Sequence, residues 1–499
     1  MLHTWFTDAV GRFPDRVALV VEDHPWTYLE LDRLSRAIAA RVVRSLPARP
    51  RVGLLAARSL TAYAAYLAIL RCGGVVVPLD AHYPEQRLAL VAELAGLDGL
   101  IAERDQPVGA AIGRAVLRFG RAWLEETLRC GGPAIDPASD REPGPDDVAY
   151  ILFTSGSTGL PKGVPIRHRH LDDLVRHCLD LYRVDRDARL SQTFRLTFDP
   201  SVLDLFLAWG AGAALIVPSE DDLFDPVSFV NRHGVTHWCS VPSMITFAAD
   251  SGLLTPAAMP SLRSSVFCGE QLTLRQAATW ADAAPGSTLD NAYGPTELTV
   301  LATSYRMPRE RSQWPRTVNG TVPIGTAFPH LQARLGPDDE LQVRGSQRFD
   351  GYLDAADDEG RFAADDDGYE SARPVPSSAW YRTGDRVAEQ DGVLVHLGRL
   401  DNQVKVMGQR VELPEVEAAL RTWAGVDEAV VVLLADDTSG GVLAAAYTGE
   451  PSTARQLRER LLAHLPVHMI PKRYQHLDSL PRNDRGKVDR AACARLLGG

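Results

Sequence analysis

The sequence predicts an α/β protein: a large N-terminal domain of mixed and parallel sheets packed with helices, followed by a small α+β C-terminal domain. The first observation is a strand–helix–strand pattern, with a β-like run at 51–56, apolar residues at helical spacing over 58–73 and a buried strand at 74–80. Such a unit implies parallel strands. The second observation is the length of 499 residues, which exceeds what a single core organises.

Sequence patterns in the later part of the chain indicate where the domain boundary lies. The alternation of strand and helix patterns recurs at 213–219, 237–252 and 264–283, which extends the α/β domain. After 396–403 the pattern changes to a strand, a helix, two further strands, a last helix and a basic tail. We therefore predict a large domain over 1–399 and a small domain over 400–499.

Composition and charge exclude several classes of function. Hydrophobic residues make up 45% and charged residues 23% of the chain, and the net charge of -11 argues against a nucleic-acid partner. No apolar run of about 18 residues and no basic, apolar leader is present, so we expect a cytoplasmic protein without a membrane span. The six scattered cysteines lack C-x-x-C and the histidines lack H-E-x-x-H, which argues against a disulfide framework or a zinc site. We interpret His168 and His170, two residues apart, as part of a solvated turn.

The segment Ile151–Val164, ILFTSGSTGLPKGV, has the composition of a phosphate-binding loop. Small residues let backbone N–H groups approach an anion closely, and serine and threonine hydroxyls add donors. A P-loop kinase or ATPase requires Gly before the lysine and Ser or Thr after it, but Lys162 stands between Pro161 and Gly163. The glycine spacing also excludes a dinucleotide fingerprint. The loop by itself therefore predicts only that a polyphosphate is bound.

The loop and the motifs around it resemble those of the adenylate-forming (ANL) superfamily, which includes acyl-CoA synthetases, luciferases and amino-acid adenylation domains. FTSGSTGLPKGV matches its signature, and the resemblance covers essentially the whole chain. The other motifs occur in order: WTYLELDRLS (26–35), LRCGGVVVPLDAHYP (70–84), FDPSVLD (198–204), NAYGPTE (291–297), YRTGD (381–385), GRLDNQVKVMGQRVELPEVE (398–417), LPVHMIP (465–471) and DRGKVDR (484–490). The resemblance implies the ANL adenylation fold with a mobile C-terminal domain.

The resemblance also implies a two-step reaction that uses ATP and Mg²⁺. A carboxylate attacks the α-phosphate of ATP to give an acyl-adenylate and pyrophosphate, and a thiol then takes the acyl group. Thr296 would contact the α-phosphate, Glu297 would ligate Mg²⁺ and Arg399 would assist at the ribose and phosphates. The remaining nucleotide-binding residues that it implies are Thr154, Ser155, Gly156, Ser157, Thr158, Gly159 and Lys162 in the loop, Asn291, Ala292, Tyr293 and Gly294 at the adenine, and Asp385 at the ribose hydroxyls.

Lys487 is the strongest catalytic candidate, with Glu297 and Thr296 beside it in the implied catalytic set. A point cation between the attacking carboxylate and the α-phosphate would stabilise charge as it moves from one to the other. Composition alone would make Lys487 a solvated lysine of a basic tail, and only its motif favours catalysis.

The resemblance further implies that the small domain rotates between the two half-reactions, with Asp401 at the hinge. Rotation would remove Lys487 and bring the segment 403–408 to the active site, where Gly408 leaves room for a pantetheine arm. Met407 and Arg485 depart from the family's usual residues, so the details of the thiol tunnel do not carry over.

Asp199 discriminates between the classes of acid that the superfamily activates. Amino-acid-activating members carry an aspartate at this position, which pairs with the substrate ammonium group, whereas aryl- and fatty-acid-activating members generally lack it. An unpaired carboxylate in an apolar pocket would be costly. Alternatively, Asp199 caps the following helix, because Pro200 suits the first helical position. We favour the ammonium role.

By motif position, the rest of the amino-acid pocket contains no second charge, which predicts a neutral substrate of small to medium size. The segments 266–274 and 291–300 resemble free-standing D-alanine–carrier-protein ligases, although Pro200 is unusual, so L-, D- and β-amino acids all stay open. The pocket residues are Asp199, Pro200, Leu203, Cys239, Val266, Cys268, Gly269, Ala292, Val300 and Leu301.

The sequence thus predicts a stand-alone, ATP-dependent amino-acid–carrier-protein ligase (AMP-forming) that serves natural-product biosynthesis. Its partner would be a phosphopantetheinylated carrier protein acting in trans. The alternative is an acyl-CoA or aryl-acid ligase of the same superfamily, against which Asp199 argues. A catalytically dead relative is disfavoured because Glu297, Asp385 and Lys487 are all present.

Overall fold

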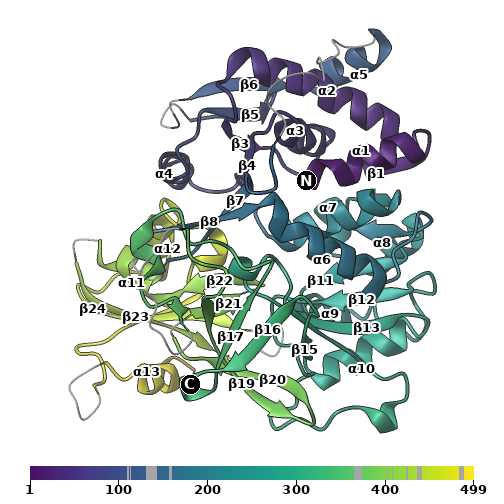
Figure 1. The fold of residues 1–499 in the computed structure, drawn as a ribbon. Helices are drawn as coiled ribbons and strands as arrows, with labels where there is room; N and C mark the ends of the chain where they lie inside the picture. The colour runs from purple at the N-terminus through teal and green to yellow at the C-terminus, as the bar shows by residue number, and fades with distance from the viewer. Residues whose placement is uncertain are drawn as a thin grey trace.

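The computed structural model describes residues 1–109, 112, 114–130, 143–156, 160–364, 374–401, 403–406, 408–422, 425–434, 441–482 and 488–498. Within these ranges the chain forms a large N-terminal domain of mixed sheets and helices and a smaller C-terminal domain, which confirms the predicted fold class (Figure 1). No helix in the same ranges is both long enough and apolar enough to cross a bilayer.

The first sheet of the large domain contains the predicted strand–helix–strand unit. β3 and β4 pair in parallel, Arg51 opposite Val75, with α3 between them in the chain. α3 is apolar on nearly every face and is buried. The strands, in spatial order, are β6 (Ala115–Phe119), β5 (Gly99–Glu103), β3 (Arg51–Leu55), β4 (Val75–Pro78), β7 (Val148–Thr154) and β8 (Lys162–Arg167). The helices of this part are α1 (Leu2–Arg12), α2 (Tyr28–Ser45), α3 (Leu60–Arg71), α4 (Glu85–Ala95) and α5 (Arg121–Cys130).

The second sheet of the large domain carries most of the predicted substrate motifs. β11, β12 and β13 run parallel, so their carboxyl ends meet at one edge. The order is β15 (Thr326–Ala327), β14 (Thr303–Arg306), β13 (Thr288–Tyr293), β12 (Ser264–Phe267), β11 (His237–Ser240), β9 (Arg189–Ser191), β10 (Ala214–Ile216), β1 (Val17–Val21) and β2 (His24–Thr27). Its helices are α6 (His168–Leu181), α7 (Pro200–Ala211), α8 (Pro226–His233), α9 (Ser243–Asp250) and α10 (Leu274–Ala283).

A third, antiparallel sheet completes the large domain. β19 and β20 form a hairpin in which Asp385 lies opposite Arg399, so the register alone brings these two side chains together. The strands are β16 (Leu331–Leu335), β17 (Glu340–Gly345), β18 (Phe362–Ala363), β19 (Trp380–Gln390) and β20 (Val393–Arg399).

The C-terminal domain begins with a two-stranded hairpin that lies against the large domain (Figure 1). A separate apolar core unites α11 with the three-stranded sheet. The elements are β21 (Gln403–Val406), β22 (Gln409–Glu412), α11 (Leu413–Arg421), β23 (Val426–Leu434), β24 (Val442–Gly449), α12 (Ala454–Leu462), β25 (Arg473–His476) and α13 (Arg490–Gly498).

The prediction of a solvated turn at His168 and His170 is wrong. Both side chains are buried in the first turn of α6. His168 accepts the Leu2 N–H at 3.1 Å, and His170 accepts the Arg167 N–H at 3.1 Å. Burial lowers the pKa of His168 to about 3, so its neutral ring serves as a hydrogen-bond acceptor. Hydrogen bonds to backbone groups, one distant in sequence and one local, offset the cost of burying these polar rings.

Candidate active site

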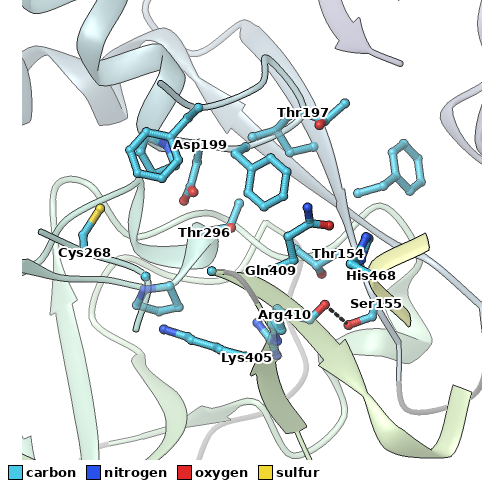
Figure 2. A pocket seen from close by; sticks show the side chains of 18 of the residues that line it. Thr154, Ser155, Thr197, Asp199, Cys268, Thr296, Lys405, Gln409, Arg410 and His468 are labelled. Carbon is cyan, nitrogen blue, oxygen red and sulfur yellow. Dashed lines mark hydrogen bonds between the residues drawn. The ribbon is translucent and has the colours of Figure 1, made fainter. Parts of the chain in front are cut away.

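A cavity of about 130 Å³ lies between the two domains and collects many of the predicted site residues (Figure 2). The C-terminal domain contributes residues of β21, β22 and the turn Val467–Met469 to its wall. The predicted residues that line it are Thr154, Ser155, Asp199, Pro200, Cys268, Gly269, Tyr293, Gly294, Thr296, Val300, Asp385 and Arg399. Ser157, Thr158, Gly159 and Lys487 lie outside the described residues.

The predicted phosphate loop begins where β7 ends. Thr154 Oγ1 is buried without a hydrogen-bond partner among the described residues. Ser155 Oγ donates to the Arg410 carbonyl at 2.9 Å (Figure 2). It also accepts the Glu412 N–H at 3.1 Å. At Gly156 a Cβ would come within 2.0 Å of the Leu160 carbonyl oxygen, so this turn requires glycine. The C-terminal domain thus already contacts the loop that the sequence assigns to phosphate.

Glu297, the predicted Mg²⁺ ligand, is fully buried in a short turn just after β13. The Tyr352 hydroxyl donates to its Oε1 at 2.5 Å, and Arg410 Nη1 lies 3.0 Å from Oε1 and 3.3 Å from Oε2. Burial opposes ionisation, but the Arg410 guanidinium and the Tyr352 hydroxyl hold the pKa of Glu297 below its ordinary value. This carboxylate is therefore ionised and paired within the protein.

Asp385, the predicted ribose acceptor, is also buried and surrounded by donors. The Tyr293 hydroxyl donates to Oδ2 at 2.7 Å, while His396 Nε2 lies 2.9 Å and Arg399 Nη1 3.0 Å from Oδ1. Although burial opposes ionisation, Arg399 and His396 hold the pKa of Asp385 well below its ordinary value. Arg399 also binds Asp401, the predicted hinge residue, through two contacts of 2.7 Å.

Three other predicted nucleotide residues lie outside the cavity wall. Asn291 is buried, and its Nδ2 donates to the carbonyls of Val322 and Pro323 at 3.0 and 2.9 Å, so it positions a neighbouring loop. Lys162 pairs with Asp357 at 2.9 Å. The third, Ala292, is buried in β13.

Asp199 lies at the wall of the cavity, beside Thr296 and close to Cys268 (Figure 2). It occupies the N-cap position of α7, but its side chain makes no capping hydrogen bond. One oxygen, Oδ2, is buried without a hydrogen-bond partner among the described residues. Burial raises the pKa of Asp199 to about 7, against the opposing effect of the Thr296 hydroxyl. The geometry contradicts the helix-cap interpretation.

A smaller cavity of about 30 Å³ lies nearby and contains predicted pocket residues that do not reach the main cavity. Leu203, Cys239 and Val266 line it, and a hydrogen bond joins the thiols of Cys239 and Cys268. The last predicted pocket residue, Leu301, is buried in the adjoining core.

Asp204 also lines the smaller cavity, and the motif comparison missed it. Its Oδ2 is buried without a partner in the described part of the chain, and burial with Cys268 nearby raises its pKa well above the ordinary value. The burial of Asp204 thus opposes its ionisation. The signal was an acidic residue inside the otherwise uncharged segment 200–209 of α7.

Two described residues of the segment 403–408 lie at the cavity, where the resemblance implied this segment would lie in one of the two domain arrangements. Lys405 and Gly408 line the cavity, and Gly408 donates its N–H to Glu270 at 2.6 Å. Gly408 has φ +76°, and a Cβ there would come within 2.3 Å of Val241 Cγ1. Lys405 and His468 were not singled out from the sequence, because their places depend on how the two domains meet.

The residues around Glu297 fit a magnesium ion that is carried mainly by substrate. No cluster of three or more His, Cys, Asp or Glu side chains able to hold a metal occurs in the described ranges. Mg²⁺ commonly uses one or two carboxylates and completes its shell with phosphate oxygens and water. A single buried carboxylate next to a phosphate loop meets that requirement.

Comparison with known protein families agrees with the resemblance that the motifs indicate. The family model described as AMP-binding enzyme matches residues 6–353, and the AMP-binding enzyme C-terminal domain model matches residues 415–487. Phosphinothricin tripeptide synthetase PhsC of Streptomyces viridochromogenes is 36% identical over 98% of this chain, and tyrocidine synthase 3 of Brevibacillus parabrevis is 32% identical over 99%. The chain spans only 45% and 8% of these two relatives.

Solved structures of similar length share the fold. The crystal structure of IdnL7 is 38% identical with a TM-score of 0.70, and the alignment covers 99% of this chain and 98% of that one. The adenylation domain AlmE of Vibrio cholerae, solved with glycyl-adenosine-5'-phosphate, is 27% identical with a TM-score of 0.82, covering 99% and 97%.

Proposed function

Because the chain belongs to the AMP-binding enzyme family, an AMP-forming family that uses ATP with Mg²⁺, we propose that it activates a neutral amino acid and transfers it to a carrier protein. The first step would form an aminoacyl-adenylate and release pyrophosphate. The second would pass the aminoacyl group to a phosphopantetheine thiol.

The observation that carries this proposal is Asp199 Oδ2 at the cavity wall, which is buried without a hydrogen-bond partner among the described residues. A buried carboxylate needs a cationic partner, and a substrate ammonium group would supply one. An aryl or fatty acid offers no such group and would leave the carboxyl unpaired. AlmE, solved with glycyl-adenosine-5'-phosphate, gives a similar protein that accommodates an aminoacyl nucleotide.

A neutral side chain on the substrate follows from the second acid of α7. Burial and Cys268 raise the pKa of Asp204 well above its ordinary value, which disfavours the charge that a cationic side chain would need. Apart from Asp199, the pocket residues predicted from the motifs are apolar or carry thiols. The two cavities are small, about 130 and 30 Å³. We therefore infer a substrate of small to medium size, with L-, D- and β-amino acids all candidates.

Within the site, we propose that the predicted residues divide the work by charge. Asp385 would accept the ribose hydroxyls and Arg399 would contact the ribose and phosphates. Thr296 and Glu297 would hold the α-phosphate and Mg²⁺. Lys487, outside the described residues, would stabilise the charge that develops at the α-phosphate.

Exchange of labelled pyrophosphate into ATP tests the proposal. The wild-type protein would be screened with L-, D- and β-amino acids and, in parallel, with benzoate and medium-chain fatty acids. We expect exchange with at least one neutral amino acid and none above background with the other acids. Exchange only with benzoate or a fatty acid would establish the alternative, an acyl-CoA or aryl-acid ligase. Transfer is then followed as aminoacylation of a phosphopantetheinylated carrier protein by intact mass.

A further inference from the structure

His396 on β20 contacts the carboxylate of Asp385 together with Arg399, although three positions separate these two residues of one strand. In a regular strand, side chains three positions apart point to opposite faces of the sheet. The β19–β20 hairpin departs from this rule, because its register shifts by one residue and pairs His396 with Val387, on the face that carries Asp385. Gly398, within the shifted stretch, has φ +129°, which favours glycine. The irregular register therefore turns the imidazole of His396 toward Asp385.

A single amide determines which nitrogen of the His396 ring carries the proton. Gln271 Nε2 donates to the His396 carbonyl oxygen at 3.0 Å and lies 2.9 Å from His396 Nδ1. Because the carbonyl oxygen can only accept, the amide nitrogen of Gln271, and not its oxygen, faces His396. The second N–H of the same amide is then directed at Nδ1, which must be the unprotonated nitrogen. Asn319 Nδ2 also donates to this carbonyl, at 2.9 Å, and holds the strand in place.

The proton of this neutral ring lies on Nε2, 2.9 Å from Asp385 Oδ1, so His396 donates to the carboxylate. The side chain of Asp385 is 5% exposed and that of His396 17%, so little water competes for this bond. Tyr293 and Arg399 supply the other donors, on Oδ2 and Oδ1 respectively. Together the three donors fix the plane of the carboxylate, and with it the direction of the lone pairs left for a ligand.

Gln271, His396 and Asp385 thus form a relay of hydrogen bonds that begins at the surface and ends in the cavity. We propose that His396 is a positioning residue, which Gln271 holds in its donating tautomer and which orients Asp385 to accept ribose hydroxyls of ATP. This inference rests on the proposed function, because that function makes Asp385 the ribose acceptor. Without the N–H of His396, the carboxylate would be free to turn toward Arg399 and Tyr293 and away from the nucleotide.

Substitutions at His396 separate hydrogen bonding from packing. The imidazole also lies near the ring of Tyr293, with 6.1 Å between centroids and an angle of 37° between the planes. His396→Phe keeps an aromatic ring at this place and removes the N–H that Asp385 accepts. His396→Gln restores a donor, because the side-chain amide of glutamine carries its N–H groups at the corresponding distance from the backbone. Gln271→Leu leaves His396 and Asp385 intact and removes the amide that sets the tautomer.

Equilibrium binding of two nucleotides tests the proposal without turnover. The dissociation constants of ATP and 2′,3′-dideoxy-ATP are measured with Mg²⁺ by calorimetry in the absence of amino acid. We expect wild type to bind ATP at least about tenfold more tightly, since dideoxy-ATP lacks both ribose hydroxyls. His396→Phe should weaken ATP binding about tenfold, the scale of one hydrogen bond to a charged group, and change dideoxy-ATP binding less than about twofold. His396→Gln should recover most of the affinity for ATP.

Gln271→Leu should act in the same direction but more weakly, by about threefold on ATP, because Gln271 is exposed and water replaces part of its contact. Nitrogen NMR of the histidine-labelled protein, with the His396 signal assigned by its loss in His396→Gln, reports the tautomer directly. Wild type at pH 8 should show a neutral ring with the proton on Nε2, and Gln271→Leu should show a mixture of tautomers. The matched control is Gln313→Leu, at another exposed glutamine, which should change neither measurement.

A His396→Phe protein that binds both nucleotides equally less well would assign His396 a structural role and overturn the proposal. A wild-type ring with its proton on Nδ1 would overturn it as well. If His396→Phe does not fold, Gln271→Leu decides, and nucleotide affinities and a tautomer equal to those of Gln313→Leu would reject the relay.

The proposed function fails in a different way. A wild-type protein that binds ATP and dideoxy-ATP equally well would reject Asp385 as the ribose acceptor, and the relay with it. Absence of amino-acid-dependent pyrophosphate exchange would reject adenylation of an amino acid but not the role of His396 in nucleotide binding. A preference for ATP that His396→Phe retains in full would reject only the relay.

Discussion

The site has two halves that treat their buried carboxylates in opposite ways. In the phosphate half, Glu297 is ionised and held by Arg410 and Tyr352. In the amino-acid half, Asp199 has an oxygen without a partner in the described structure, and burial raises its pKa to about 7. The protein supplies partners to both oxygens of the first carboxylate, and the described residues supply none to one oxygen of the second. Under the proposed function, this difference means that the substrate supplies the charge that pairs with Asp199.

The largest effect on activity is expected from removing the carboxylate of Asp199. Asp199→Ala should lower the kcat/KM of amino-acid-dependent pyrophosphate exchange by about 1000-fold, because the buried ammonium group loses its partner. Asp204→Asn is the matched control, at a second buried acid of the same helix whose pKa burial raises well above its ordinary value. It should cost less than about fivefold. Equal losses in the two variants would mean that the pocket, and not the charge, was damaged.

The next largest effect on activity is expected from removing Lys487, which would stabilise the charge that develops at the α-phosphate. Lys487→Ala should lower the rate of adenylate formation by about 100-fold, the scale of losing one electrostatic donor. Lys472→Ala, at an exposed lysine of the same domain, serves as the control. The rate is measured by exchange and by single-turnover formation of the adenylate. A Lys487→Ala protein that adenylates at the wild-type rate would remove this lysine from the proposed mechanism.

A smaller effect is expected from pH. Asp199 must be ionised to pair with an ammonium group, and its pKa in the free protein is about 7. Burial and Glu297 oppose its ionisation, whereas Thr296 and Lys405 favour it. The kcat/KM of exchange should therefore fall about tenfold between pH 8 and pH 6. Amino acids keep their ammonium charge over this range. A flat profile in wild type would show that Asp199 is already ionised.

The smallest effect is on stability, and it has opposite signs in the two halves. The pKa of Asp199 is higher in the folded protein, about 7, than in the unfolded chain. The stabilisation that comes from this protonated carboxyl is therefore complete below the unfolded pKa and is lost as pH rises through about 7. Asp199→Asn should thus raise the unfolding midpoint at pH 8 by a few degrees. Glu297 has a lowered pKa and stabilises above its unfolded pKa, so Glu297→Gln should lower the midpoint at pH 8, because Arg410 loses a buried partner.

These midpoints are compared by calorimetry at pH 5 and pH 8 without ligand. The gain from Asp199→Asn should shrink at pH 5, where the wild-type carboxyl is already protonated. Stabilisation by both substitutions would contradict the contrast between the halves.

Part of this picture could be predicted from the sequence. The unit at 51–80 follows from local periodicity, and its strands and helix formed as predicted. The motifs predicted that Asp199 and Thr296 share one cavity, since residues that end parallel strands or begin the next helix meet at one edge of a sheet. Asp385 reaches the same cavity from an antiparallel hairpin of another sheet.

The rest depends on contacts that no local pattern encodes. Arg410 and Glu297 are 113 positions apart and meet only because the hairpin of one domain docks on the other. His168 is buried because a backbone amide from α1 reaches it, 166 positions away. The raised pKa of Asp204 arises from burial in the folded core, which its sequence neighbours do not report.

The most direct test of the central claim compares an amino acid with its des-amino analogue, the same acid without the ammonium group. Using the best amino acid from the exchange screen, the ratio of kcat/KM for the pair is measured in wild type, Asp199→Ala and Asp204→Asn. We expect a ratio of at least about 100 in wild type and in Asp204→Asn, and a ratio near one in Asp199→Ala. A wild-type protein that activates both acids equally well would contradict the assignment of Asp199 to the substrate ammonium group.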